Sequence, residues 1–257
     1  MGPIKGIIFD IDGVLEYQGH VFPGAIEVLE ELRSRNLKLR FLTNSTLKSR
    51  ASCASKLRKK GFAVADEEVV TASYATAEYL KGLNPGSIWV MLDREGLDEF
   101  REFVHDENDP EYIVVGDYRS RFDFEHLNRA LRLLVRGAHL IGMQNELTDG
   151  SFGELELNVG SWVEMLERAS GVQAVYIGKP FPYAFQLATR SLGLAQSEVL
   201  VVGDRVSTDI LGAKNAGLRS ALVKTGEFRP ADLQAGIQPD WILEDIRELI
   251  GLLSHKT

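Results

Sequence analysis

Two carboxylates, Asp10 and Asp12, close an apolar stretch near the start of the chain and are separated by one residue. The apolar run from Gly6 predicts a buried strand, and side chains two residues apart in an extended segment point to the same side. Gly13 follows and allows the backbone to turn sharply and to approach a ligand closely. This pair suits covalent phosphoryl transfer, in which one carboxylate attacks phosphorus and the other handles the leaving group's proton. The alternative interpretation is an ordinary strand followed by a tight turn. The other motifs of the chain must decide between these two interpretations.

Further polar groups stand just beyond three other predicted strands. They are Thr43 and Asn44 after residues 37–42, Lys179 after residues 174–177, and Asp204 after residues 199–202. In open α/β sheets, ligands bind outside the carboxyl ends of the strands. We therefore expect one pocket to collect all of these side chains.

Each residue type has a task in such a pocket. The hydroxyl of Thr43 and the amide of Asn44 can hydrogen-bond phosphate oxygens. The charge of Lys179 can keep Asp10 ionised and offset negative charge on the phosphoryl group. Alone, a Thr-Asn pair after a strand is an ordinary turn or helix cap, and a lone Lys-Pro is a still weaker signal.

The carboxylates also predict a metal site. Asp204 offers a hard oxygen ligand, and together with Asp10 it suits Mg²⁺, which binds substrate phosphate as well. Asp209 lies five residues after Asp204, in the stretch from Gly203 to Asp209, and could orient Lys179 or a metal-bound water. The alternative is that Asp209 only sits favourably in the first turn of a helix.

Strand-like runs alternate with helical patterns along the chain, which favours an α/β protein with a largely parallel sheet. One helix is expected after Pro23, and the others at residues 48–60, 72–81, 96–105, 124–136 and 161–169. The basic face of the helix at 48–60 is expected to be solvated. The remaining strands are expected at residues 88–92, 112–115, 139–143, 220–223 and 241–243. We predict a Rossmann-like, doubly wound core of residues 1–79 and 176–257, with a smaller α/β domain inserted at residues 80–175.

Composition narrows the class of protein. The formal charge of −8 argues against a broad surface for nucleic acid or for an anionic membrane. Cys53 is the only cysteine, so no internal disulfide can form, and we interpret it as a bystander on a helix. The opening residues lack the features of a secretory signal, and no apolar run approaches the length of a membrane span. We expect a cytoplasmic protein.

The joint order of the motifs resembles the haloacid dehalogenase-like phosphohydrolase superfamily. Its four motifs match, in order, Asp10 to Val14, Leu42 to Asn44, Gly178 to Pro180, and Gly203 to Asp209. The insertion resembles a C2-type cap of the IIA branch, which contains nitrophenylphosphatase-like, phosphoglycolate phosphatase-like and phospholysine phosphohistidine inorganic pyrophosphate phosphatase-like proteins. The phrases Val114 to Asp117 and Lys224 to Gly226 look like that branch too.

The resemblance implies a role for each motif residue. Asp10 would be the nucleophile that forms an aspartyl-phosphate, and Asp12 the general acid and base. Thr43 and Lys179 would bind the transferring phosphoryl group. Mg²⁺ would be held by the carboxylates of Asp10 and Asp204 and by the backbone carbonyl of Asp12, with Asp209 behind these ligands.

The insertion is expected to shape the substrate cavity, while the core defines the reaction. Five residues lie just past predicted strands of the insertion and could face the site, namely Asp117, Tyr118, Arg119, Asn145 and Glu146. Ordinary surface turn residues are the alternative interpretation for most of them.

The function predicted from the sequence is a Mg²⁺-dependent phosphatase that acts on a small phosphorylated metabolite. A phosphomutase or phosphotransferase is the alternative among enzymes, since an acceptor other than water could capture the phosphoryl group. A non-catalytic phosphate-binding module is the alternative from another class. We expect no nucleic-acid or membrane partner and a possible homodimer through the cap.

Overall fold

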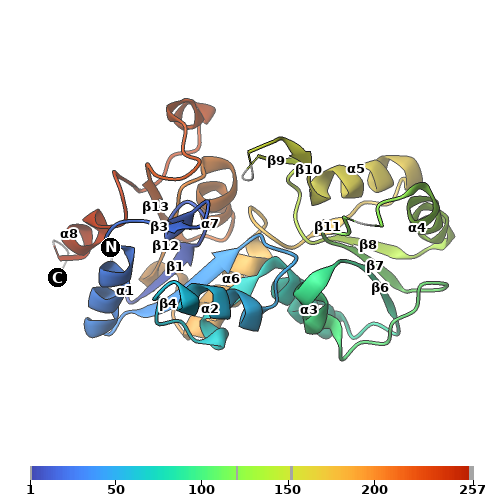
Figure 1. Ribbon diagram of the computed structural model, residues 1–257, viewed down its shortest axis with the longest axis horizontal. Helices are drawn as coiled ribbons and strands as arrows, with labels where there is room; N and C mark the ends of the chain where they lie inside the picture. Colours follow the sequence, from blue (N-terminus) through green and yellow to red (C-terminus); the bar gives the residue numbers. More distant parts are fainter. Residues whose placement is uncertain (1, 120, 151–152, 255–257) are drawn as a thin grey trace. The chain divides into compact units, whose positions relative to one another are not determined.

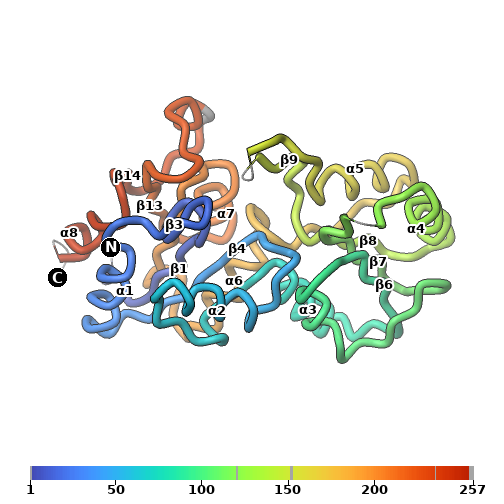
Figure 2. The backbone as a smooth tube through the Cα atoms, in the orientation of Figure 1, coloured from blue at the N-terminus to red at the C-terminus, as the bar shows by residue number. Residues whose placement is uncertain are grey.

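The computed structural model describes residues 2–119, 121–150 and 153–254 (Figure 1). The chain divides into two compact units. The first unit comprises Met1–Thr43, Cys53–Val70 and Lys179–Thr257, and the second comprises Asn44–Ser52 and Thr71–Gly178. In the backbone trace the first unit is made of the blue beginning and the orange-red end of the chain (Figure 2).

A six-stranded sheet with the order β14-β13-β12-β1-β4-β5 lies at the centre of the first unit. Its strands are β1 (Gly6–Asp10), β4 (Lys38–Thr43), β5 (Val69–Thr71), β12 (Val199–Gly203), β13 (Arg219–Val223) and β14 (Trp241–Leu243). β1 pairs in parallel with β4 on one side and with β12 on the other. The strand order therefore reverses at β1, and the crevice beyond the carboxyl end of such a strand is where open α/β sheets bind ligands.

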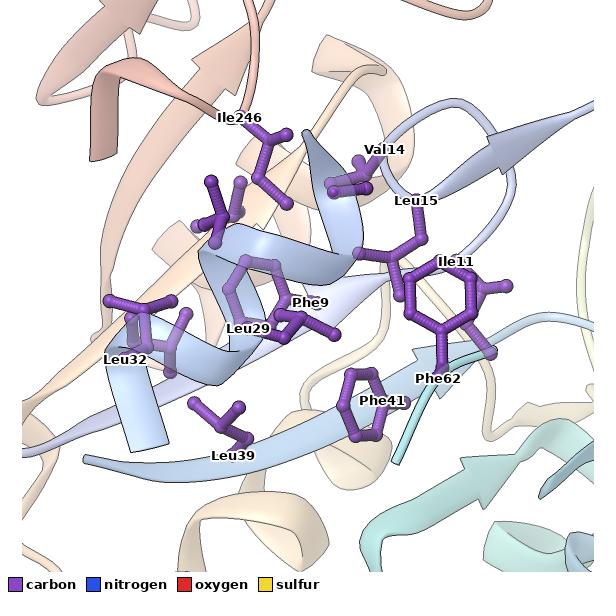
Figure 3. Close-up of a cluster of buried hydrophobic side chains, with 14 of the residues drawn as sticks. Phe9, Ile11, Val14, Leu15, Leu29, Leu32, Leu39, Phe41, Phe62 and Ile246 are labelled. Atoms are coloured by element: carbon purple, nitrogen blue, oxygen red, sulfur yellow. The ribbon is translucent and has the colours of Figure 1, made fainter. Parts of the chain in front are cut away.

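Helices cover both faces of this sheet, so the predicted doubly wound α/β core is confirmed. On one face, Ile7 and Phe9 of β1 join a buried cluster with residues of α1 (Ala25–Ser34), α2 (Arg50–Lys59) and α8 (Glu248–Ser254). Figure 3 shows Phe9 with Leu29 and Leu32 of α1. Side chains alternate along a strand, so Ile8 and Asp10 point to the opposite face. On that face α6 (Pro182–Leu192) contacts β1 and β4, and α7 (Leu211–Asn215) contacts α6.

Short elements connect these strands and helices. They are the hairpin of β2 (Glu16–Tyr17) and β3 (His20–Val21), the 3₁₀ helices η1 (Asp66–Glu68), η3 (Gln196–Glu198) and η5 (Pro230–Ala235), and the π-helical turn η4 (Val206–Ile210). The hairpin follows β1 after a loop of residues 11–15.

The second unit has its own parallel sheet, in the order β11-β8-β7-β6. Its elements are α3 (Ala72–Leu83), β6 (Ile88–Met91), η2 (Arg94–Phe100), β7 (Tyr112–Val115), α4 (Phe124–Arg136), β8 (His139–Gly142), β9 (Thr148–Asp149), β10 (Glu156–Leu157), α5 (Val159–Ser170) and β11 (Val175–Tyr176). Its separate core includes Trp89, Leu134 and Val163. The unit starts before the predicted domain boundary at residue 80 because α3 packs against η2.

The predicted helix at residues 96–105 is wrong beyond Phe100, where η2 ends. The chain there runs alongside β6 instead of continuing as a helix. Ile88 donates its N–H to the carbonyl of Val104 at 2.9 Å, and its own carbonyl accepts from the N–H of Asp106 at 2.9 Å. Strand-type pairing thus satisfies the backbone groups that a helix would have used.

Within the described ranges, every helix is too short or too polar to cross a membrane.

Candidate active site

A buried ion-pair cluster lies at the carboxyl end of β1. Asp10 is the last residue of this strand and its side chain is 9% exposed. The Nζ atom of Lys179 lies 2.7 Å from Oδ1 of Asp10 and donates a hydrogen bond of 2.7 Å to Oδ1 of Asp209. Residues from three distant chain segments therefore meet around one ammonium group.

Asp204 completes a group of three carboxylates. It follows β12 and is fully buried. Its Oδ2 atom accepts a 2.7 Å hydrogen bond from the N–H of Glu227, whereas Oδ1 has no hydrogen-bond partner in the part of the chain that the structure describes. Oxygen atoms of Asp10, Asp204 and Asp209 lie within 4.8 Å of one another. Leaving a buried carboxylate oxygen unpaired is costly, and hard oxygen donors suit a divalent cation. This set of residues therefore fits a divalent metal ion.

Two glycines close over the Asp204 carboxylate. Gly13 has a φ of +94°, and a Cβ atom at this position would lie 2.0 Å from Oδ2 of Asp204. Gly226 has a φ of +62°, and its Cβ would lie 2.3 Å from the same oxygen. Thr225 donates a 2.5 Å hydrogen bond to the carbonyl of Gly13 and so ties the two glycine loops together. Only residues without a side chain allow this approach of backbone to carboxylate.

The electrostatics of the cluster favour an additional cation. Burial raises the pKa of Asp10 well above its usual range, although the Lys179 ammonium opposes this shift. Burial likewise raises the pKa of Asp204 to about 7, and the nearby charge of Asp209 adds to the effect. Burial alone would lower the pKa of Lys179, but Asp10 and Asp209 outweigh it and raise that pKa. Three ionised carboxylates and one ammonium carry a net charge of −2, which a divalent cation would neutralise.

The other predicted residues of the core lie near the same edge of the sheet. The register of β1 and β4 pairs Asp10 with Leu42, so Thr43 lies one residue further along β4. Thr43 is buried. Asp12 lies two residues beyond the end of β1, in a loop rather than in the strand, and is exposed.

Asn44 belongs to the second unit and is already engaged there. Its Nδ2 atom donates a 3.2 Å hydrogen bond to Oε2 of Glu146. The backbone N–H of Glu146 donates in turn to Oε1 of Gln144 at 2.6 Å. The amide predicted to bind phosphate therefore lies beside a carboxylate of the inserted segment.

Three further cap residues named from the sequence have structural partners. Tyr118 is 3% exposed and packs edge-on against Phe122 in the core of the second unit, which makes it a core residue rather than a turn residue. The guanidinium of Arg119 pairs with Asp117 at 2.9 Å and with Glu156 at 3.0 Å. Both pairs are partly exposed.

The sequence did not indicate Glu227 as part of this site. Thr225 and Gly226 were noted only because they resemble a phrase of the IIA branch, and no role in the site was predicted for them. These residues form the loop after β13, and their contacts to Gly13 and Asp204 are made by a hydroxyl and by backbone atoms. The position of the loop just past a predicted strand was the one available signal.

Comparison with known proteins agrees with this geometry. Residues 7–104 match the haloacid dehalogenase-like hydrolase family, and residues 176–249 match the HAD-hydrolase-like family. A phospholysine phosphohistidine inorganic pyrophosphate phosphatase of Xenopus laevis is 32% identical over 242 residues, which cover 89% of this chain and 86% of the relative. Haloacid dehalogenase-like hydrolase domain-containing protein 2 of Bos taurus is 33% identical over 231 residues, which cover 89% and 87%. The crystal structure of a 4-nitrophenylphosphatase from Thermotoga maritima has a TM-score of 0.90 at 31% identity and covers 96% of this chain and 97% of that chain.

The chain belongs to the haloacid dehalogenase-like hydrolase family, as the order of its motifs predicted. Within this family it is a phosphatase, a hydrolase of phosphoric monoesters.

Proposed function

We propose that this protein is a Mg²⁺-dependent phosphatase that hydrolyses a small phosphorylated metabolite through a covalent phosphoenzyme on Asp10. The observation that carries the proposal is the buried contact of Asp10 with Lys179 beside Asp204 and Asp209. A carboxylate nucleophile needs a charged partner, and Lys179 is that partner for Asp10.

In the first step an oxygen of Asp10 forms a bond to phosphorus while the bond from phosphorus to the ester oxygen breaks. Asp12 is exposed near the end of β1 and gives its proton to the departing oxygen. In the second step Asp12 takes a proton from water, whose oxygen forms a bond to phosphorus while the bond from phosphorus to the Asp10 oxygen breaks, and inorganic phosphate leaves. The Asp10 carboxylate is then restored.

Lys179 and Asp209 act on the phosphoryl group together. The Asp209 carboxylate accepts from Lys179 through Oδ1 and from the N–H of Arg205 through Oδ2 at 3.2 Å, so it fixes the ammonium in place. The ammonium can then offset charge on the transferring phosphoryl group. The Thr43 hydroxyl is proposed to hydrogen-bond phosphate oxygens.

The carboxylates of Asp10 and Asp204, together with the Asp12 carbonyl, are the groups we propose to hold Mg²⁺. The ion would supply positive charge that keeps the acidic cluster ionised and binds phosphate oxygens. The unpartnered Oδ1 atom of Asp204 supports this assignment.

The second unit is proposed to choose the substrate. The names of similar proteins mention phospholysine, phosphohistidine, inorganic pyrophosphate and 4-nitrophenyl phosphate. All of these carry a terminal phosphoryl group, so they form a reasonable first panel for this chain.

The experiment that tests the proposal is a phosphate-release screen over such a panel and over sugar, nucleotide and small-acid phosphates, with and without Mg²⁺. Asp10→Asn should abolish release, because an amide cannot act as the nucleophile. Asp66→Asn, which alters a surface pair with Arg58, is the matched control and should retain release. Phosphate release by the Asp10→Asn protein at the wild-type rate would refute the proposal, and release only with an added acceptor would indicate a phosphotransferase.

A further inference from the structure

Glu16 is a buried carboxylate that the mechanism above does not use. It begins β2, and its side chain is 1% exposed. The Nζ atom of Lys56 lies 2.5 Å from Oε1 of Glu16, and Lys60 donates to Oε2. Lys56 lies on α2 and Lys60 immediately follows that helix. The expectation that the basic face of this helix is only solvated is therefore wrong for these two lysines.

The backbone of Glu16 closes the loop that carries Asp12. The N–H of Gly13 donates to the carbonyl of Glu16 at 2.7 Å, and the N–H of Glu16 donates to the carbonyl of Ile11 at 3.2 Å. Asp12 and Glu16 also form an isolated β-bridge. Asp12 thus lies inside a short loop whose two ends are joined by hydrogen bonds.

The apolar residues of the same loop are anchored in the core. Ile11, Val14 and Leu15 belong to the buried cluster between the sheet and α1 (Figure 3). Lys60 donates a second hydrogen bond of 3.0 Å to the carbonyl of Gly19, in the turn of the β2–β3 hairpin. The hairpin is therefore held to the end of α2 through both the Glu16 side chain and its own turn.

The opposite charges of Glu16 and the two lysines, Lys56 and Lys60, stabilise the contact between them. Burial alone would raise the pKa of Glu16, but the hydrogen bonds from Lys56 and Lys60 outweigh burial and lower it. Glu16 is therefore ionised at neutral pH. The side chains of Lys56 and Lys60 are 38% and 19% exposed, so both can turn toward water when the carboxylate is lost. Breaking the contact should then release the loop without unfolding the unit.

We propose that Glu16 is a positioning residue for Asp12, because its ion pairs with Lys56 and Lys60 fix the loop that presents the general acid to the leaving group. This inference rests on the role of Asp12 in the proposed function. If the general acid is misplaced, cleavage slows only for those esters whose leaving group needs a proton. The selectivity between leaving groups therefore reports on the position of Asp12.

The test compares kcat/KM for 4-nitrophenyl phosphate and for a simple alkyl phosphate in the presence of Mg²⁺. The ratio kcat/KM covers the steps up to the first irreversible one and leaves out hydrolysis of the phosphoenzyme. Glu16→Gln should lower kcat/KM for the alkyl ester about 10- to 100-fold and that for the nitrophenyl ester by less than about 3-fold. Lys60→Met should shift the ratio in the same direction, and Lys60→Arg should retain the wild-type ratio.

Two variants serve as matched controls. Glu68→Gln breaks another ion pair of the first unit, with Arg33 at 2.7 Å, and Lys59→Met removes an exposed charge from α2. Both should leave the ratio between the two esters unchanged. If the Glu16→Gln protein fails to fold, Lys60→Met carries the test.

Equal loss for both esters, or no loss for either, in Glu16→Gln and Lys60→Met would overturn the positioning role. Wild-type protein that hydrolyses neither ester would instead overturn the proposed function. A further check is the Glu16→Gln/Asp12→Asn double variant, which should be no more selective than Asp12→Asn alone because both changes act through one group.

Discussion

A side chain at Gly13 and the carboxylate of Asp204 would occupy the same space, since a Cβ atom on Gly13 would lie 2.0 Å from Oδ2 of Asp204. The loop after β1 therefore lies directly against the Asp204 carboxylate. This contact links the geometry of the loop after β1 to that of the loop after β12.

Gly13→Ala is predicted to displace Asp204 and to lower phosphatase activity by about 100-fold or more, since misplaced ligands weaken metal binding. Gly236→Ala is the matched control, because Gly236 also has a positive φ, +77°, but no atom within 4 Å of its Cβ position. The control should lose about 1 kcal/mol of stability from backbone strain alone and keep its activity. Steady-state rates and thermal unfolding of both variants check this, and equal losses of activity would contradict it.

Lys179→Met is predicted to destabilise the metal-free protein by about 3–5 kcal/mol, because it leaves buried carboxylates without their partner. Lys5→Met breaks the exposed pair with Glu198, in which the lysine side chain is 56% exposed, and should cost less than about 1 kcal/mol. Urea unfolding of the two variants without metal gives the comparison. A Lys179→Met protein as stable as Lys5→Met would rule out a tight buried pair.

The contribution of Asp204 to the stability of the metal-free protein is predicted to fall as the pH rises from 3.8, the ordinary pKa of Asp, to about 7, the raised pKa of Asp204. The unfolded chain loses the proton first in this window, so ionisation of the buried carboxylate opposes folding. Above about pH 7 the Asp204 contribution should level off, and Mg²⁺ should restore more stability at higher pH because it binds the ionised form. Asp204→Asn should flatten this dependence in urea unfolding. A slope that is identical in wild type and variant would contradict the assignment.

Much of the fold follows from the sequence because buried strands are short apolar runs. The strands predicted at residues 37–42, 88–92 and 199–202 correspond to β4, β6 and β12 for this reason. The reactive groups at their carboxyl ends converge because parallel strands end at a common edge. Convergence of Asp10, Lys179 and Asp204 was therefore predictable before any coordinates were known.

Some contacts could not be predicted from the sequence. They join elements that are neither neighbouring strands of a sheet nor residues at helical spacing. Glu16 looks like one more charged residue after a turn, and the lysines at positions 56 and 60 look like an exposed helix face. Only packing of the hairpin against the end of α2 brings them together. The role of Tyr118 was hidden in the same way, since its burial depends on Phe122 and the second core.

The most direct test of the central claim is to trap the covalent intermediate. Asp12→Asn protein should still be phosphorylated by 4-nitrophenyl phosphate, whose leaving group needs little protonation, but should hydrolyse the phosphoenzyme slowly because it lacks a base. After acid quenching, borohydride reduces an acyl phosphate to an alcohol, and peptide mass spectrometry locates the resulting homoserine. We predict homoserine at position 10, and modification at another residue, or none while 4-nitrophenol is released in a burst, would contradict the account.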